Sequence, residues 1–172
     1  MTQEKKHKDE ISFDYVTRLA KETSLRDGKQ PPCMIIDGSR NLLFRVIPEF
    51  PGTAAERTRF LHLAGKHEAK SGEAGHIRQI FFISESWISI SDANNLPKTL
   101  PSQAPNRKEA LLVVGLKIQG RVKSHKVFEM IRNNKGRLVD LQEFSLKNEM
   151  VDTSLLEAFF EGFQNAFLER VN

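Results

Sequence analysis

Several residue types and long apolar runs are scarce in this chain, and their scarcity excludes whole classes of protein. The 172 residues include a single cysteine, Cys33, which excludes an internal disulfide and any zinc site built on the cysteines of one chain. No apolar run approaches the roughly 18 residues of a membrane span, and residues 1–10 lack the apolar core of a secretory signal. We therefore expect a cytoplasmic protein with no membrane partner.

The motifs of common enzyme families are missing as well. Glycines occur singly, so neither the phosphate-binding loop nor the dinucleotide fingerprint is present, and there is no Gly-x-Ser-x-Gly nucleophile elbow. His62 and His67 stand five residues apart, which is off the spacing that places two imidazoles on one helical face. Cys33 opens an apolar run and reads as a buried hydrophobic residue. The sequence predicts no catalytic residue, no metal site and no cofactor, and it favours a non-enzymatic protein.

The bulk composition describes an ordinary globular domain. Hydrophobic residues make up 39% of the chain and charged residues 28%, and this length is sufficient to bury a core without disulfides or metals. Twelve phenylalanines against one tyrosine and one tryptophan favour packing over hydrogen-bonded recognition. We predict a flexible segment at 1–10 and a single domain at 11–172, with a long loop at 92–107 that contains three prolines.

Capping and stop signals predict three helices. The expected helices run from Ser12 to Asp27, from Thr53 to Gly72, and from Ser154 to Val171. The second opens on a capping box, because the Thr53 oxygen can accept a backbone N–H while Glu56 reaches back to the backbone of Thr53. The third has Asp152 or Thr153 as its cap. Gly28 follows the first helix and favours its termination there.

Apolar runs between turn residues predict the strands, at 34–37, 42–47, 77–83 with an extension toward 90, 110–118, 122–131 and 137–144. The segment 122–131 suits a helix or a strand, and we favour a strand because the turn 133–136 leads into a partner. Gly115 inside an apolar strand suggests a bulge. Short connections imply antiparallel pairing, so we predict an α+β two-layer domain. Its mainly antiparallel sheet has five to six strands and its order is α-β-β-α-β-β-β-β-α.

The loop region offers a candidate ligand site. Its candidate residues are Glu85, Trp87, Asp92, Arg107 and Lys108. A carboxylate pair beside an aromatic wall has the ingredients of acid–base chemistry, and the two basic residues suit an anion. The alternative is a strand end with surface charges and a tryptophan packed under its own loop. A small hydrolase or ligand-binding protein with a site under 85–107 is therefore one hypothesis.

A basic hairpin is followed by an acidic segment. Seven bases and one acid lie within 117–137, whereas seven acids and two bases lie within 138–172. The basic residues proposed to contact nucleic acid are Arg121, Lys123, Lys126 and Arg132. Only Phe128 is available among them for base stacking. Two alternatives stay open: balance by the acidic segment, in the same chain or a neighbour, and plain solvation of an edge strand.

The C-terminal helix gives a signal for self-association. It carries more apolar surface than a peripheral amphipathic helix usually shows, with Phe159, Phe163 and Phe167 as the candidate oligomer interface. The alternative is a deeply buried core helix.

The segments 82–87, 101–103 and 105–109 resemble those of an uncharacterised bacterial protein family, a resemblance that implies no activity, cofactor or ligand. Our leading hypothesis is a non-catalytic domain acting through an unknown protein partner or as a homo-oligomer, with a dimer expected.

Overall fold

A computed structural model describes residues 10–89, 100–144 and 153–171. The predicted flexible segment 1–10, apart from its last residue, and the first half of the predicted loop 92–107, residues 92–99, lie outside these ranges. The helices are α1 (Phe13–Asp27), α2 (Ala54–Ser71) and α3 (Ser154–Val171), with short 3-10 turns at η1 (Pro101–Gln103) and η2 (Gln119–Arg121). The strands are β1 (Cys33–Gly38), β2 (Leu42–Val46), β3 (Ile77–Ile88), β4 (Lys108–Lys117), β5 (Val122–Arg132) and β6 (Leu138–Glu143).

The predicted caps define the helix ends. The Ser12 hydroxyl accepts the backbone N–H of Tyr15 at 3.1 Å, and Gly28 ends α1 in the left-handed conformation that glycine adopts without a steric penalty. The Thr53–Glu56 capping box is formed in both directions at the start of α2. These local signals are satisfied within a few residues of the chain, which is why sequence alone identifies them.

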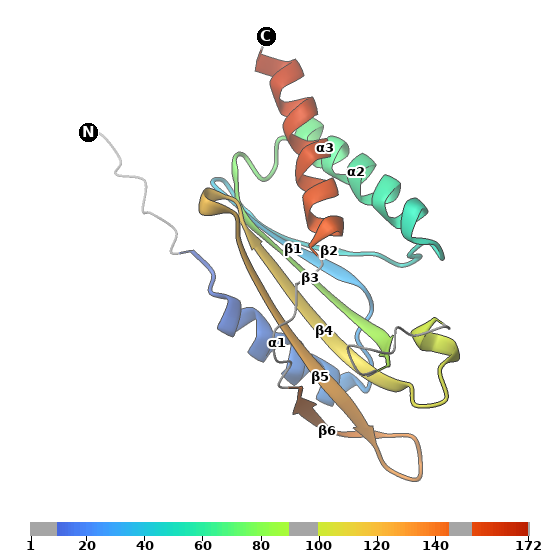
Figure 1. Cartoon of the computed structure of the whole chain (residues 1–172). Helices are drawn as coiled ribbons and strands as arrows, with labels where there is room; N and C mark the ends of the chain where they lie inside the picture. The colour runs from blue at the N-terminus through green and yellow to red at the C-terminus, as the bar shows by residue number, and fades with distance from the viewer. Residues whose placement is uncertain (1–9, 90–99, 145–152, 172) are drawn as a thin grey trace, which may run out of the picture.

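The six strands form one antiparallel sheet in the order β2-β1-β3-β4-β5-β6, and the predicted α+β class and element order are confirmed. Segment 122–131 is a strand, as predicted. The helices α2 and α3 pack together as a layer over one face of the sheet, whereas α1 lies alone against the opposite face (Figure 1). Each face therefore has its own apolar cluster.

Alternation along the strands sorts the core into these two clusters. On β1 and β3, Met34, Ile36, Ile80 and Phe82 point toward α2 and α3, whereas Ile35 and its neighbours on the same face point toward α1. Such strands are buried on both faces, which explains why their sequences are almost continuously apolar.

The bulge predicted at Gly115 is wrong. The pairing of β4 with β3 and with β5 runs without a shift through this residue. A Cβ at position 115 would lie 3.0 Å from the ring of Phe13 and 3.1 Å from the ring of Phe81. Glycine is therefore placed here to admit the first aromatic side chain of α1 against the sheet.

Cys33 is buried in the cluster under α1, as its apolar sequence context predicts. Burial raises the pKa of its thiol to about 12, an effect that a contact from Gln30 only partly offsets. At neutral pH the sulfur is therefore a protonated, unreactive thiol in the folded protein.

Candidate functional site

The structure brings some of the residues predicted around the loop together and separates others. Glu85 and Trp87 lie on the face of the sheet that α1 covers, and the Arg107 guanidinium lies 5.0 Å from the centre of the Trp87 ring. Lys108 points to the opposite face, where its amine forms an ion pair with Glu129 at 2.8 Å. Asp92 lies outside the described residues. The four of these side chains that the structure describes are therefore split between the two faces of the sheet.

Glu85 belongs instead to a polar cluster where β3, β4 and β5 meet the end of α1. Its carboxylate accepts the backbone N–H of Gln30. Nearby, Arg132 donates two hydrogen bonds of 2.7 Å to Glu109 and a third, of 3.0 Å, to the carbonyl oxygen of Gly28. Glu109 was not identified from the sequence, because nothing local indicates that it lies opposite Trp87 on the neighbouring strand.

Burial and neighbouring charges determine the electrostatics of this cluster. Burial raises the pKa of Glu85, and the neighbouring Glu109 adds to the effect, while the hydrogen bond from Gln30 and the charge of Arg132 oppose it. The Arg132 guanidinium is already held in a forked contact. The strong donor of the cluster is therefore already engaged within the chain, by Glu109 and by the carbonyl oxygen of Gly28.

Replacing Glu85 with glutamine should make the protein more stable at neutral pH. The folded-state pKa of Glu85 is raised, so the wild type loses stability as the pH rises from the ordinary glutamate value through that raised pKa. The variant has no charge to bury and avoids this loss. Urea unfolding between about pH 4 and pH 8 should show its advantage growing with pH and then levelling off. A variant less stable than wild type at neutral pH would show that the contacts of the carboxylate outweigh its burial.

The four basic residues proposed for nucleic acid do not form one surface. Lys123 forms an ion pair with Glu157 of α3 at 2.8 Å, and Lys126 pairs with Glu143 of β6 at 3.0 Å. Strand alternation places these two lysines on opposite faces of the sheet. Arg132 is held by Glu109, as described above. Both lysines therefore pair with acidic residues from segment 138–172 of the same chain. These contacts correspond to the alternative in which the acidic segment balances the charge of the basic hairpin.

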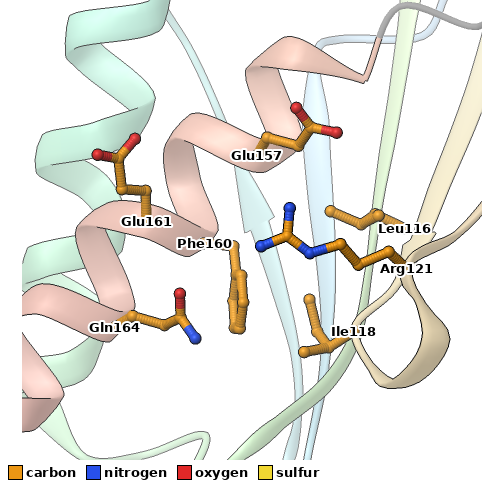
Figure 2. A pocket seen from close by; sticks show the side chains of 7 residues that line it. All are labelled: Leu116, Ile118, Arg121, Glu157, Phe160, Glu161 and Gln164. Atoms are coloured by element: carbon orange, nitrogen blue, oxygen red, sulfur yellow. The ribbon is translucent and has the colours of Figure 1, made fainter.

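Arg121, the fourth of these residues, lines a cavity of about 240 Å³ beside α3. Its guanidinium points toward the helix, on the side that carries Glu157 and Phe160 (Figure 2). Lys123 and Thr153, with a smaller contribution from Arg121, hold the pKa of Glu157 below its ordinary value. Arg121 has a φ of 49°, the left-handed conformation that non-glycine residues rarely adopt. The cavity is small and its charges of opposite sign lie side by side.

The phenylalanines of α3 are largely core residues. Phe159 and Phe163 are 2% and 4% exposed and pack between α2 and the sheet, and Phe167 is partly buried against the same cluster. Two of the three side chains predicted to form an oligomer interface are therefore already covered by their own chain. Phe159 and Phe163 are thus residues of a core helix, the alternative that the sequence left open, because α3 packs its broad apolar arc against α2.

An apolar stripe on β2 was not apparent from the sequence. Leu42, Phe44 and Val46 are 49%, 56% and 52% exposed, and they alternate along a strand that ends the sheet. We call these three residues the β2 stripe. Their strand partners Asp37, Ile35 and Cys33 place the β2 stripe on the face that α1 covers elsewhere. The hairpin was predicted, but the pattern did not reveal which strand would be left at the edge.

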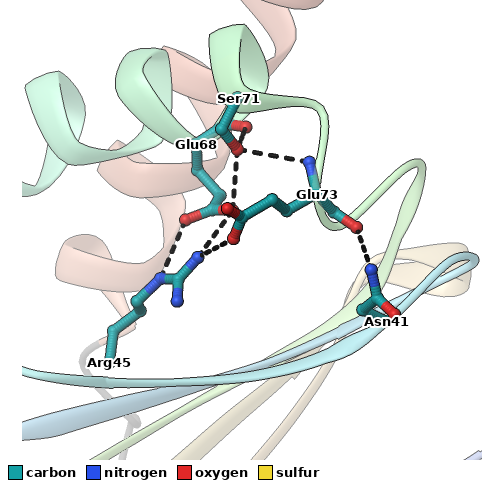
Figure 3. A network of polar contacts seen from close by, with 5 residues as sticks. All are labelled: Asn41, Arg45, Glu68, Ser71 and Glu73. Atoms are coloured by element: carbon teal, nitrogen blue, oxygen red, sulfur yellow. Dashed lines mark hydrogen bonds and ion pairs between the residues drawn. The ribbon is translucent and has the colours of Figure 1, made fainter.

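The other face of β2 carries an ion-pair network that was also not anticipated. Arg45 donates to both carboxylate oxygens of Glu68 on α2, at 3.2 and 3.3 Å, and to Glu73 just beyond that helix (Figure 3). Ser71 donates a further hydrogen bond to Glu68 at 3.2 Å. The two carboxylates keep the pKa of Arg45 above its ordinary value. This network stands at the mouth of a cavity of about 520 Å³ between α2 and the β1–β2 hairpin.

Comparisons with known proteins add no assignment, since no protein-family model, no curated protein and no solved structure matches this chain. Within residues 10–89, 100–144 and 153–171, no three His, Cys, Asp or Glu side chains are grouped to hold a metal ion. In that same part of the chain, none of the helices combines the length and apolarity needed to cross a membrane.

Proposed function

We propose that this chain is a non-catalytic interaction domain that associates with a second copy of itself along the edge strand β2. The observation that carries the proposal is the β2 stripe, an apolar and half-exposed surface on a strand that ends the sheet and that, among the described residues, has no strand on its outer side. Such an edge is a template for pairing with another chain, and proteins usually protect it with charges or cover it. The compartment we propose is the cytoplasm, where an unpaired thiol such as Cys33 stays reduced.

Backbone geometry supports pairing through the same residues. The N–H of Ile47 donates to the carbonyl oxygen of Pro32, and the carbonyl oxygen of Asn41 accepts from Gly38, so odd-numbered residues of this strand turn their polar groups toward β1. Along an antiparallel strand, the backbone N–H and C=O groups of successive residues point alternately to one side of the strand and to the other. The backbone groups of the three β2-stripe residues therefore point outward, into the position of a further strand.

A second copy suits this edge because the β2 stripe is self-complementary. A two-fold axis through Phe44 would place Phe44 opposite its symmetry mate and Leu42 opposite Val46 of the other subunit. All the side chains brought together on that face are apolar. Arg45, the one charged residue of β2, lies on the opposite face and is engaged by Glu68 and Glu73. Symmetric pairing therefore brings no uncompensated like charges into contact.

The opposite edge of the sheet lacks this character. The exposed side chains of β6 include Asp140, Gln142 and Glu143, and antiparallel pairing of two such strands would bring carboxylates together. Charged residues of this kind are a common protection against edge pairing. We therefore expect association through β2 to close at two subunits and not to continue into a filament.

The test of this proposal replaces Phe44 with lysine. The wild type should have twice the chain mass of 19.6 kDa by light scattering, and the variant should be monomeric because two ammonium groups would meet across the axis. Phe44 is more than half exposed, so the fold measured by circular dichroism should be unchanged. The matched control is Val139→Lys on β6, an apolar residue at the other edge that is also about half exposed, and this variant should leave the dimer intact.

Cross-linking tests the register. A Phe44→Cys variant should form an intermolecular disulfide under mild oxidation, since directly paired residues in such strands lie about 5.5 Å apart between Cα atoms. Val46→Cys alone should not, because its symmetry mate would be four residues farther along the strand. Native Cys33 is buried and should not form a disulfide in either variant. A wild-type monomer at all concentrations, or a Phe44→Lys variant with unchanged dimer mass, overturns the proposal.

A further inference from the structure

The cavity between α2 and the β1–β2 hairpin has the size of a small-molecule site. Its volume of about 520 Å³ falls within the range of about 300–1,000 Å³ typical of ligand pockets. Much of its lining is apolar, from Met34, Ile36, Ile47, Phe60, Leu61 and Phe159. Several of these side chains also belong to the core between the sheet and the α2–α3 layer. The cavity is therefore continuous with the core packing, and Ile47, Pro48 and Glu73, from the segments that follow β2 and α2, complete its lining.

The mouth of this cavity carries an excess of negative charge. Two carboxylates, Glu68 and Glu73, face one guanidinium, that of Arg45. The Glu68 side chain is only 7% exposed, whereas those of Arg45 and Glu73 are about half exposed, at 43% and 54%. The pair of carboxylates therefore keeps one formal negative charge that Arg45 does not neutralise, at the boundary between an apolar interior and solvent.

Glu68 also has capacity for a further donor. Its hydrogen bonds from Arg45 measure 3.2 and 3.3 Å, longer than the roughly 2.7–2.9 Å of a strong charge-assisted contact. A carboxylate offers about four lone-pair positions, and Glu68 receives these two bonds and one from Ser71. A cationic group arriving beside Arg45 would therefore find a buried carboxylate that is incompletely satisfied.

We propose that this cavity binds a small apolar molecule that carries a protonated amine. The apolar part would lie against Leu61 and Phe159, and the ammonium group would sit at the mouth between Glu68 and Glu73. A carboxylate of the same length would be repelled by these residues, and a neutral alcohol would gain only the apolar contacts. The cavity is formed mainly from the face of β2 opposite the β2 stripe. Val46 of the stripe also lines it, whereas Phe44, at the centre of the proposed dimer, does not.

The experiment compares three probes that share one alkyl chain: n-octylamine, n-octanol and octanoate. Their affinities follow from the rise in thermal unfolding temperature with probe concentration, because a ligand of the folded state stabilises it. We expect octylamine to bind at least about tenfold more tightly than the other two, the size of a hydrogen bond to a charged group. Absence of binding by any probe, or a preference for octanoate, overturns the proposal.

Two variants locate the binding. Ala64→Phe should fill the cavity and abolish octylamine binding, whereas Leu63→Phe, on the exposed side of the same helix, should leave it unchanged. Glu73→Gln should reduce the preference for octylamine over octanol without changing the affinity for octanol. The Glu73 side chain is half exposed, so this substitution should leave the fold unchanged. Undiminished octylamine binding in Ala64→Phe would place the amine elsewhere and refute the site. Phe44→Lys should bind octylamine normally, which separates this test from that of the dimer.

Discussion

Replacing Gly162 with alanine is expected to lower the free energy of unfolding by about 3 kcal/mol, the upper part of the range for overpacked cores. Gly162 lies in the interior of α3, and a Cβ there would overlap the carbonyl oxygen of His62 on α2. The reciprocal holds for Gly65 of α2, whose Cβ would overlap the carbonyl oxygen of Phe159. The two helices therefore touch backbone to backbone at this crossing, and each glycine makes room for the other helix.

Helix propensity predicts the opposite sign, which makes the experiment decisive. Alanine is favoured over glycine by about 1 kcal/mol in the interior of a helix, so a loosely packed pair of helices would be stabilised by either substitution. Here the obstructing atoms are backbone atoms, which cannot rotate away as the end of a side chain can. We expect the steric cost to exceed the gain in propensity, and we expect Gly65→Ala to behave like Gly162→Ala.

Urea unfolding followed by far-UV circular dichroism measures both effects. The control is Gly52→Ala, because Gly52 is exposed and a Cβ there meets no atom within 4 Å. Its free energy of unfolding should change little or rise slightly. If Gly162→Ala were as stable as the wild type, α2 and α3 would have to lie farther apart than the structure places them.

The contact between α2 and α3 illustrates what the sequence cannot reveal. Both helices were predicted, and the Thr53 cap of α2 was identified, because caps and periodicity act within a few residues of the chain. Nothing local shows that Gly65 and Gly162, almost a hundred positions apart, serve the same crossing. Each alone reads as an unfavourable residue inside a helix. Their common purpose appears only when the two helices are placed side by side.

The candidate sites also depend on how distant parts of the chain are placed, which local sequence patterns do not show. The run Leu42–Val46 is apolar at four of its five positions, which is the composition of an interior strand, yet β2 ends the sheet. That mismatch between composition and position is the observation behind the proposed dimer. Conversely, the basic residues of the hairpin suggested one surface, but strand alternation and partners from α3 and β6 distribute them over both faces. Charge counted along the chain does not reveal the face on which a side chain lies.

The second large effect is expected for Asp37, whose carboxylate is 2% exposed at the end of β1. It accepts hydrogen bonds from Arg78 and from the side-chain amide of Gln79, at 2.9 Å, on the neighbouring strand β3. It also accepts the backbone N–H of Ile11, at 3.3 Å, just before α1. One buried carboxylate thus joins two central strands to the segment that leads into the first helix.

Asp37→Ala should lower the free energy of unfolding by about 3 kcal/mol, the lower end of the range for breaking a buried ion pair. We choose the lower end because the Arg78 side chain is a quarter exposed and water can solvate part of its charge. Asp37→Asn keeps an acceptor of the same shape and should lose less. Asp27, in an exposed ion pair with Arg26, provides the control, and Asp27→Asn should not change stability measurably.

Hydrogen exchange can show whether Asp37 anchors α1 or supports the sheet as a whole. In Asp37→Ala the amides of α1 should exchange faster than those of α2, because the lost contact to Ile11 anchors the entry to α1, while the capping box of α2 is untouched. Equal acceleration in both helices would show that the carboxylate supports the sheet as a whole and not the docking of α1. A variant as stable as the wild type would contradict both roles, since a buried carboxylate with these partners cannot be removed without cost unless the partners find others.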